Sequence, residues 1–116
     1  MNDITFACRT MSIDQLLRCT LNLNNTEMNL LKYMVNCEKE CDIKNLITVM
    51  KKNRTTVQRA LNVLIENKLI VRRQINLENG GYFFVYSPLP KNKIKEKINE
   101  NFNGFTRAVE EAIEKW

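Results

Sequence analysis

The spacing of the apolar residues changes twice along this chain, and these changes limit the folds that it can adopt. Between residues 12 and 68 the apolar residues recur at intervals of three and four, the spacing of amphipathic helices. Residues 69–86 contain two short β-type runs, and the helical spacing returns from residue 98. We therefore expect a mainly α-helical chain with one small β-hairpin, an α+β fold.

Four short helices are predicted before the hairpin, each from an apolar stripe that follows a capping residue. The third and fourth are joined by only a few residues around Lys51, Lys52 and Asn53, which predicts a helix-turn-helix. The last of the four should end near Asn67, which we expect to take a left-handed conformation. The four predicted ranges are 12–21, 25 to about 36–38, 42 to about 51, and 53–67.

The β-hairpin is predicted from two strands, about 69–77 and 82–86, that flank Glu78-Asn79-Gly80-Gly81. An Asn-Gly pair supplies the two positive-φ residues of a type I′ turn. A hairpin directly after a helix-turn-helix is the arrangement of a winged helix-turn-helix. We call the hairpin of residues 70–86 the wing.

A last helix is predicted after Pro88 and Pro90, and its apolar residues are spaced by four and three. This C-terminal seam is too short for an isolated coiled coil, so we expect it to pack on the N-terminal helix, on a second subunit or on both, and we favour a homodimer. Its residues are Ile98, Phe102, Phe105, Val109, Ala112 and Trp116. The length fits a single domain, 1–116, with a winged-helix core at 12–87 and this dimerisation segment at 88–116.

The positive charge is concentrated in residues 43–73, which carry eight lysines and arginines and one acidic residue, Glu66. Such a block inside a folded domain is typical of a surface for nucleic acid, although a solvated basic face without a partner has the same pattern. Arginine can bond guanine, glutamine and asparagine can bond adenine, and lysine suits phosphate. The predicted DNA-binding residues are Lys51, Lys52, Asn53, Arg54, Thr55, Thr56, Gln58, Arg59, Asn62, Arg72 and Arg73.

Arg72 and Arg73 begin the wing, and at least one of them should face DNA. The competing interpretation is that one of them pairs with Glu66 or Glu78. The tip of the wing has no arginine or lysine, so we expect the wing to touch the DNA backbone rather than to enter the minor groove.

Several residue types that catalysis needs are missing or scarce. The chain has no histidine and three glycines, and its two serines, Ser12 and Ser87, are not in a nucleophile elbow. We therefore expect neither enzymatic activity nor a cofactor. No apolar run is long enough for a membrane span, and no secretory signal is visible, so a cytoplasmic protein is expected.

The stretch from Asn53 to Arg72, NRTTVQRALNVLIENKLIVR, resembles the recognition helix and wing entry of MarR/TrmB-like winged-helix transcriptional regulators. The resemblance covers about residues 12–86 and is greatest with small archaeal members. It implies a sequence-specific regulator that binds double-stranded DNA as a homodimer. In that interpretation the recognition helix, about 53–67, enters the major groove.

Two alternatives remain open at this level. Winged helices also serve as protein–protein interaction subunits, for example of a transcription or replication assembly. The cysteines could also make the regulator a redox or metal sensor, although free or structural thiols are the simpler interpretation. Cys19 is predicted to lie in the core, and Cys37 and Cys41 would share a helix face if the second helix extended that far. The candidate ligands are Cys8, Cys19, Cys37 and Cys41.

Overall fold

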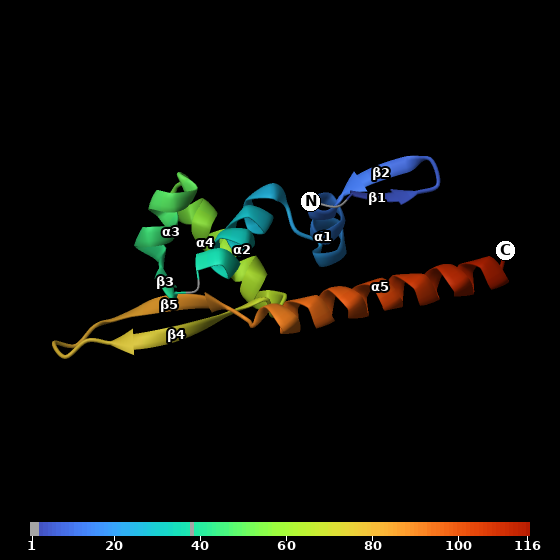
Figure 1. Cartoon of the computed structure of the whole chain (residues 1–116). Helices are drawn as coiled ribbons and strands as arrows, with labels where there is room; N and C mark the ends of the chain where they lie inside the picture. The colour runs from blue at the N-terminus through green and yellow to red at the C-terminus, as the bar shows by residue number, and fades with distance from the viewer. Residues whose placement is uncertain (1–2, 38) are drawn as a thin grey trace. The chain divides into compact units, whose positions relative to one another are not determined.

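The computed structural model describes residues 3–37 and 39–116, and these residues form five helices and five short strands (Figure 1). Residues 25–91 form one compact unit, and residues up to 24 together with 92–116 form a second. Residue 38, to which the prediction for the second helix extended, lies outside the described residues, as do residues 1 and 2 of the predicted domain. The elements are β1 (Asp3–Phe6), β2 (Arg9–Ser12), α1 (Ile13–Leu21), α2 (Asn25–Cys37), β3 (Cys41–Asp42), α3 (Ile43–Met50), α4 (Arg54–Glu66), β4 (Ile70–Asn76), β5 (Tyr82–Pro88) and α5 (Lys91–Glu114).

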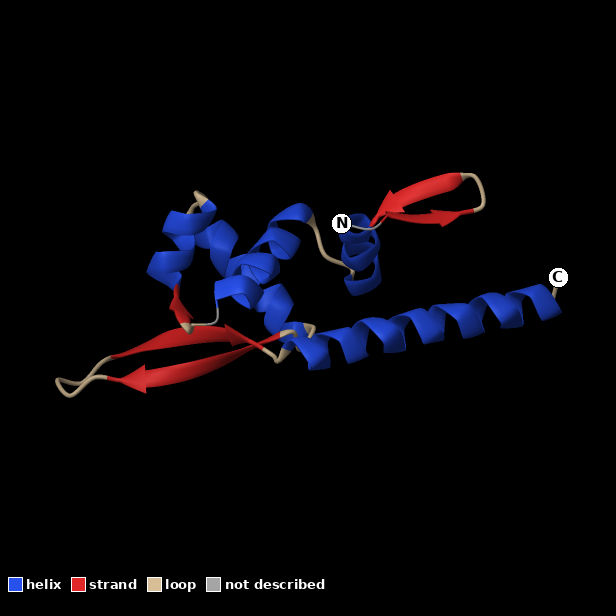
Figure 2. Ribbon diagram, in the orientation of Figure 1, coloured by secondary structure: helices blue, strands red, loops and turns tan. Residues whose placement is uncertain are grey.

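The unit of residues 25–91 is a winged helix-turn-helix, which confirms the predicted fold class. Helix α4 packs against α2, α3 and β4, and the antiparallel sheet has the strand order β3-β5-β4. The β4–β5 hairpin extends away from the three helices (Figure 2). The apolar stripes meet in one core whose fully buried members are Leu30, Met34, Leu46, Val57, Leu61, Leu64 and Leu69.

The helix-turn-helix is held by two side-chain caps and one left-handed residue. The Asp42 side chain accepts a hydrogen bond from the Asn45 backbone N–H at 2.8 Å, and the Asn53 side chain accepts one from the Thr56 N–H at 2.8 Å. Each satisfies a backbone donor that a helix start leaves unpaired. Lys51 ends α3 with φ +55°, so the chain turns into α4 within three residues.

Two local predictions are wrong, one at the end of α4 just before the wing and one at the tip of the wing. Asn67 has φ −81°, and the left-handed residue after α4 is Lys68, with φ +58°. At the tip, the Gly80 N–H donates to the Leu77 carbonyl at 3.2 Å, and positive φ falls at Gly80 rather than Asn79. The hairpin is therefore present, but its turn is not type I′.

The second unit contains one element that the sequence pattern did not indicate. Strands β1 and β2 form a hairpin before α1, and its turn passes through Ala7 with φ +54°. Helix α1 begins with a capping box between Ser12 and Gln15, as the cap signal at Ser12 predicted. Cys19 is exposed on α1, so its predicted place in the core is wrong.

Helix α5 is continuous over 24 residues and belongs to the same unit as α1. The Asn101 side chain donates a hydrogen bond to the Thr20 carbonyl at 3.0 Å, which joins the two helices. Within residues 3–37 and 39–116, no helix combines the length and the apolar character needed to cross a bilayer.

Candidate nucleic-acid interface

The outer face of α4 is polar and exposed along its whole length. Arg54, Thr55, Arg59 and Asn62 are exposed, and they recur at the spacing of one helix face. The opposite face carries the buried stripe that packs on α2 and α3. The core contacts therefore determine which side chains of α4 are presented to solvent.

The N-terminal end of α4 combines several sources of positive potential. Lys51 and Lys52 are exposed in the turn before the helix, and Arg54 is its first residue. The unpaired N–H groups of a helix start add a partial positive charge. Among the described residues, no carboxylate lies within ion-pairing distance of Lys51, Lys52, Arg54 or Arg59. This cluster can therefore attract a polyanion without first breaking an ion pair.

Three of the predicted residues, two on α4 and one at its N-cap, use their side chains in hydrogen bonds within the protein. The Gln58 amide donates to the Asn62 side-chain oxygen at 3.2 Å, one turn along the helix. Asn53 uses its side-chain oxygen as the cap of α4. Gln58 and Thr56 are half-buried. The Gln58–Asn62 pair fixes the orientation of two amides that could otherwise rotate freely.

Arg72 and Arg73 lie on opposite faces of β4, since side chains alternate along a strand. Arg73 is opposite Val85 of β5, and it forms two hydrogen bonds with Glu40: Nε to Oε2 at 3.0 Å and Nη2 to Oε1 at 2.5 Å. This ion pair lowers the pKa of Glu40 below its usual range. One arginine of the wing therefore pairs with an acid, but the acid is Glu40 rather than Glu66 or Glu78.

Arg72 has an aromatic neighbour instead of an acidic one. Its guanidinium carbon lies 4.2 Å from the centroid of the Phe84 ring, and Tyr82 meets Phe84 edge to face at 5.5 Å. A cation over a ring keeps its full charge while the stack restricts its motion. Arg72 thus offers an ordered positive charge on the wing, and no carboxylate in residues 3–37 or 39–116 forms an ion pair with it.

Glu40 is the residue of this surface that the sequence analysis missed. It is 33 residues from Arg73 in the chain, and it comes close only because β3 and β4 both pair with β5. No local pattern around Glu40 signals such a partner.

The four cysteines are divided between the two units. Cys8 and Cys19 are exposed in one unit, whereas Cys37 is half-buried and Cys41 is buried in the other. Helix α2 ends at Cys37, so Cys41 is on β3 and not on a shared helix face. Within the part of the chain that the structure describes, no three His, Cys, Asp or Glu side chains are grouped to hold a metal ion.

The C-terminal seam changes in exposure along α5. Ile98 and Phe102 are half-buried, but Phe105 is 67% exposed and Trp116 is fully exposed. Val109 and Ala112, between them on the seam, are also exposed. The outer half of α5 therefore presents an apolar face to solvent.

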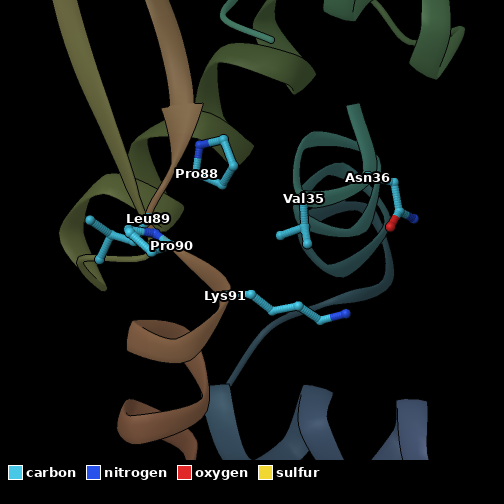
Figure 3. A pocket seen from close by; sticks show the side chains of 6 residues that line it. All are labelled: Val35, Asn36, Pro88, Leu89, Pro90 and Lys91. Atoms are coloured by element: carbon cyan, nitrogen blue, oxygen red, sulfur yellow. The ribbon is translucent and has the colours of Figure 1, made fainter. Parts of the chain in front are cut away.

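A pocket of about 370 Å³ lies beside the end of α2 (Figure 3). Val35 and Asn36 line one side of it, and Pro88, Leu89 and Pro90 line the other, with the Lys91 side chain below Val35 in this view. Its lining contains one ionisable side chain and no other charged group, so it has no evident catalytic arrangement.

Comparisons with known proteins give a family and several related structures. The model of the DnaD N-terminal domain family matches residues 13–107. The uncharacterized protein MJ1503 of Methanocaldococcus jannaschii is 29% identical over 108 residues, which are 90% of this chain and 81% of that protein.

Two solved structures bear on the candidate interface. A possible transcriptional regulator from Methanosarcina mazei superposes with a TM-score of 0.91 at 28% identity, over 99% of this chain and 97% of that one. MepR of S. aureus, in a complex with DNA, superposes with a TM-score of 0.55 at 17% identity, over 88% and 83% of the two chains. The second likeness shows the winged-helix fold alone.

Proposed function

This chain belongs to the family of DnaD N-terminal domains, and from its winged-helix fold and basic surface we propose that it is a sequence-specific DNA-binding transcriptional regulator. Support for a DNA-binding regulator comes from the relatives as well: one is described as a possible transcriptional regulator, and another with this fold is seen with DNA. The finer assignment to MarR/TrmB-like regulators is part of the proposal.

The observation that carries the proposal is the uncompensated charge at the start of α4. Lys51, Lys52, Arg54 and Arg59 are all exposed, and no described carboxylate pairs with any of them. Leaving four like charges unpaired on one surface disfavours a compact fold through their mutual repulsion, so such a surface is best explained by an anionic partner.

In this proposal the predicted DNA-binding residues form two groups: some contact bases and the others contact phosphates. Arg54, Thr55, Gln58, Arg59 and Asn62 approach base edges in the major groove of double-stranded DNA, where bidentate contacts discriminate between base pairs. The remaining residues bind the backbone and fix the register of the helix. These are Lys51, Lys52, Asn53, Thr56, Arg72 and Arg73, of which Arg73 shares its charge with Glu40.

We further propose that two copies of the chain pair through the C-terminal seam. The exposed apolar side chains on the outer half of α5 support this, because a helix face of this kind is costly to leave in water. A two-fold dimer would present two recognition helices to a pseudo-palindromic site.

One observation favours a second candidate, a protein–protein interaction subunit. The wing exposes apolar side chains, and an interaction module would use such residues. The exposed residues are Val71, Leu77, Tyr82 and Phe83. The basic face of α4 has no role in that alternative, which is why we place it second.

The test is a fluorescence-anisotropy titration of the protein with mixed-sequence duplex DNA over a series of salt concentrations. Each neutralised phosphate contributes about −0.9 to the log–log slope of affinity against salt. We expect micromolar binding, and the K51A/K52A variant should lose up to about two units of slope. The matched control K95A/K115A removes two exposed lysines, one on α5 and one directly after it, and should leave the slope unchanged.

A folded protein that fails to bind duplex DNA at low salt would overturn this proposal. Pull-down of a protein partner that survives the K51A/K52A substitutions, but not substitution of Tyr82 and Phe83, would then favour the interaction module.

A further inference from the structure

Two cysteine sulfurs lie next to each other where α2 ends and β3 begins. Cys37 Sγ is 3.9 Å from Cys41 Sγ, and the Tyr33 hydroxyl is 3.8 Å from Cys37 Sγ. A disulfide bond is about 2.0 Å long, so the two sulfurs need to approach by only about 2 Å. Cys41 is anchored by the pairing of β3 with Tyr86 of β5, and Cys37 is the last residue of α2.

The two thiols differ in accessibility and in acidity. The Tyr33 hydroxyl beside Cys37 stabilises its thiolate and holds the pKa of that thiol below its usual value. Burial raises the pKa of the Cys41 thiol to about 11. Since the thiolate is the nucleophile in thiol chemistry, Cys37 is the first to react and Cys41 stays protonated beside it.

We propose that Cys37 and Cys41 are a thiol–disulfide exchange site, which low-molecular-weight disulfides such as oxidised glutathione convert to an intramolecular disulfide. The Cys37 thiolate attacks one sulfur of glutathione disulfide, a protein–glutathione bond forms, and one glutathione thiolate leaves. Cys41 then gives its proton to solvent, attacks Cys37 Sγ and expels the second glutathione thiolate. Two protein thiols are oxidised and one glutathione disulfide is reduced to two glutathione molecules.

The position of this pair distinguishes it from the other cysteines. Cys8 and Cys19 are exposed, and neither has another described cysteine sulfur within hydrogen-bonding distance, so oxidised glutathione would leave adducts on them. Between Cys37 and Cys41 lies Glu40, the partner of Arg73, and directly after Cys41 lies Asp42, the cap of α3. A disulfide would therefore form where α2 leads into β3 and α3, beside the residue that pairs with Arg73 of the wing and beside the cap of α3. The exchange reaction itself does not depend on DNA binding.

The experiment treats the C8S/C19S variant with oxidised glutathione, quenches it with acid, blocks free thiols with N-ethylmaleimide and records the intact mass. We expect a monomer lighter by two hydrogen atoms, without glutathione or maleimide, that dithiothreitol returns to the reduced form. The rate should fall as the pH is lowered, because protonation removes the Cys37 thiolate.

Single variants separate the two roles. In C41S the resolving thiol is missing, so a stable glutathione adduct should accumulate on Cys37; in C37S the buried Cys41 should react many-fold more slowly. Peptide mapping of the oxidised wild-type protein should find the Cys37–Cys41 disulfide without the need for substitutions. Adducts on both cysteines, disulfide-linked dimers, or two thiols that stay reactive to maleimide would each overturn the proposal.

Discussion

Glu40 and Arg73 meet across strand β5, although neither belongs to it. Arg73 lies on β4 opposite Val85, and Asp42 of β3 pairs with the same Val85 from the other side. Glu40 precedes β3 by one residue, so its carboxylate reaches the arginine over the central strand through two hydrogen bonds. Both side chains are largely exposed, so the bridge acts more by fixing the base of the wing than by stabilising the fold.

The first prediction concerns the pH dependence of this bridge. Because Arg73 lowers the pKa of Glu40, the ion pair stabilises the fold above the usual pKa of a glutamate and is lost as the pH falls through the lowered value. We expect E40Q to unfold at lower urea than the wild type at pH 7, and the two proteins to converge only after the pH has fallen below the usual pKa of a glutamate and through the lowered pKa of Glu40. A difference that persists at low pH would mean that Glu40 does not act through its charge.

The second prediction concerns the positive charge of Arg73, which pairs with Glu40 and is therefore less available to DNA. E40Q releases Arg73, so affinity for duplex DNA should rise and the salt slope should steepen by up to about 0.9. The matched substitution R72Q removes the stacked arginine, and it should weaken binding and flatten the slope by a similar amount. An unchanged slope in E40Q would remove Arg73 from the set of phosphate contacts.

The sequence predicts the helix-turn-helix because local signals suffice for it. Asn53 caps α4 as its side-chain chemistry indicates, and Val57, Leu61 and Leu64 are buried as their spacing requires. The β1–β2 hairpin was missed because its turn at Ala7 has none of the glycine or asparagine residues that signal a turn. At the wing tip, two adjacent glycines made more than one turn type possible.

The residues of the surface that could not be predicted are those that meet through the sheet. Glu40 reaches Arg73 only because β3 and β4 flank β5. Cys41 does lie near Cys37, as their spacing of four allowed, but it is on β3 and not on the helix face that the sequence suggested. Spacing along the sequence carries no information about the Glu40–Arg73 contact, since that contact depends on strand order.

The third prediction separates base contacts from phosphate contacts on α4. Arg59 is exposed on the outer face, so R59A should cost roughly 1–3 kcal/mol of binding and relax specificity if it bonds a base. The measurement compares a selected duplex with a scrambled one by anisotropy. An equal loss on both duplexes would make Arg59 a phosphate contact.

The fourth prediction tests the cap of the recognition helix. N53A removes the acceptor for the Thr56 N–H and should lower the free energy of unfolding by about 1 kcal/mol. N53S retains a capping oxygen and should recover most of that loss. Urea unfolding of the three proteins checks this, and equal stabilities would show that the first turn of α4 does not depend on its cap.

The last prediction tests the dimer through the exposed half of α5. Phe105 and Val109 lie one turn apart on the C-terminal seam, at 67% and 39% exposure. Sedimentation at micromolar concentration should give the wild type twice the chain mass of 13.7 kDa and F105S/V109S the mass of a single chain. Burial of apolar area drives such an association, so replacing two apolar side chains at its centre should raise the dissociation constant by orders of magnitude.

The control for this prediction is R107S, which changes an exposed residue of the same helix outside the seam. It should sediment as the wild type does, and far-ultraviolet circular dichroism should give all three proteins the same helix content. A monomeric wild type would contradict the dimer and leave the apolar face of α5 to another partner. Loss of the dimer in R107S as well would show that association depends on the charge of α5 and not on its seam.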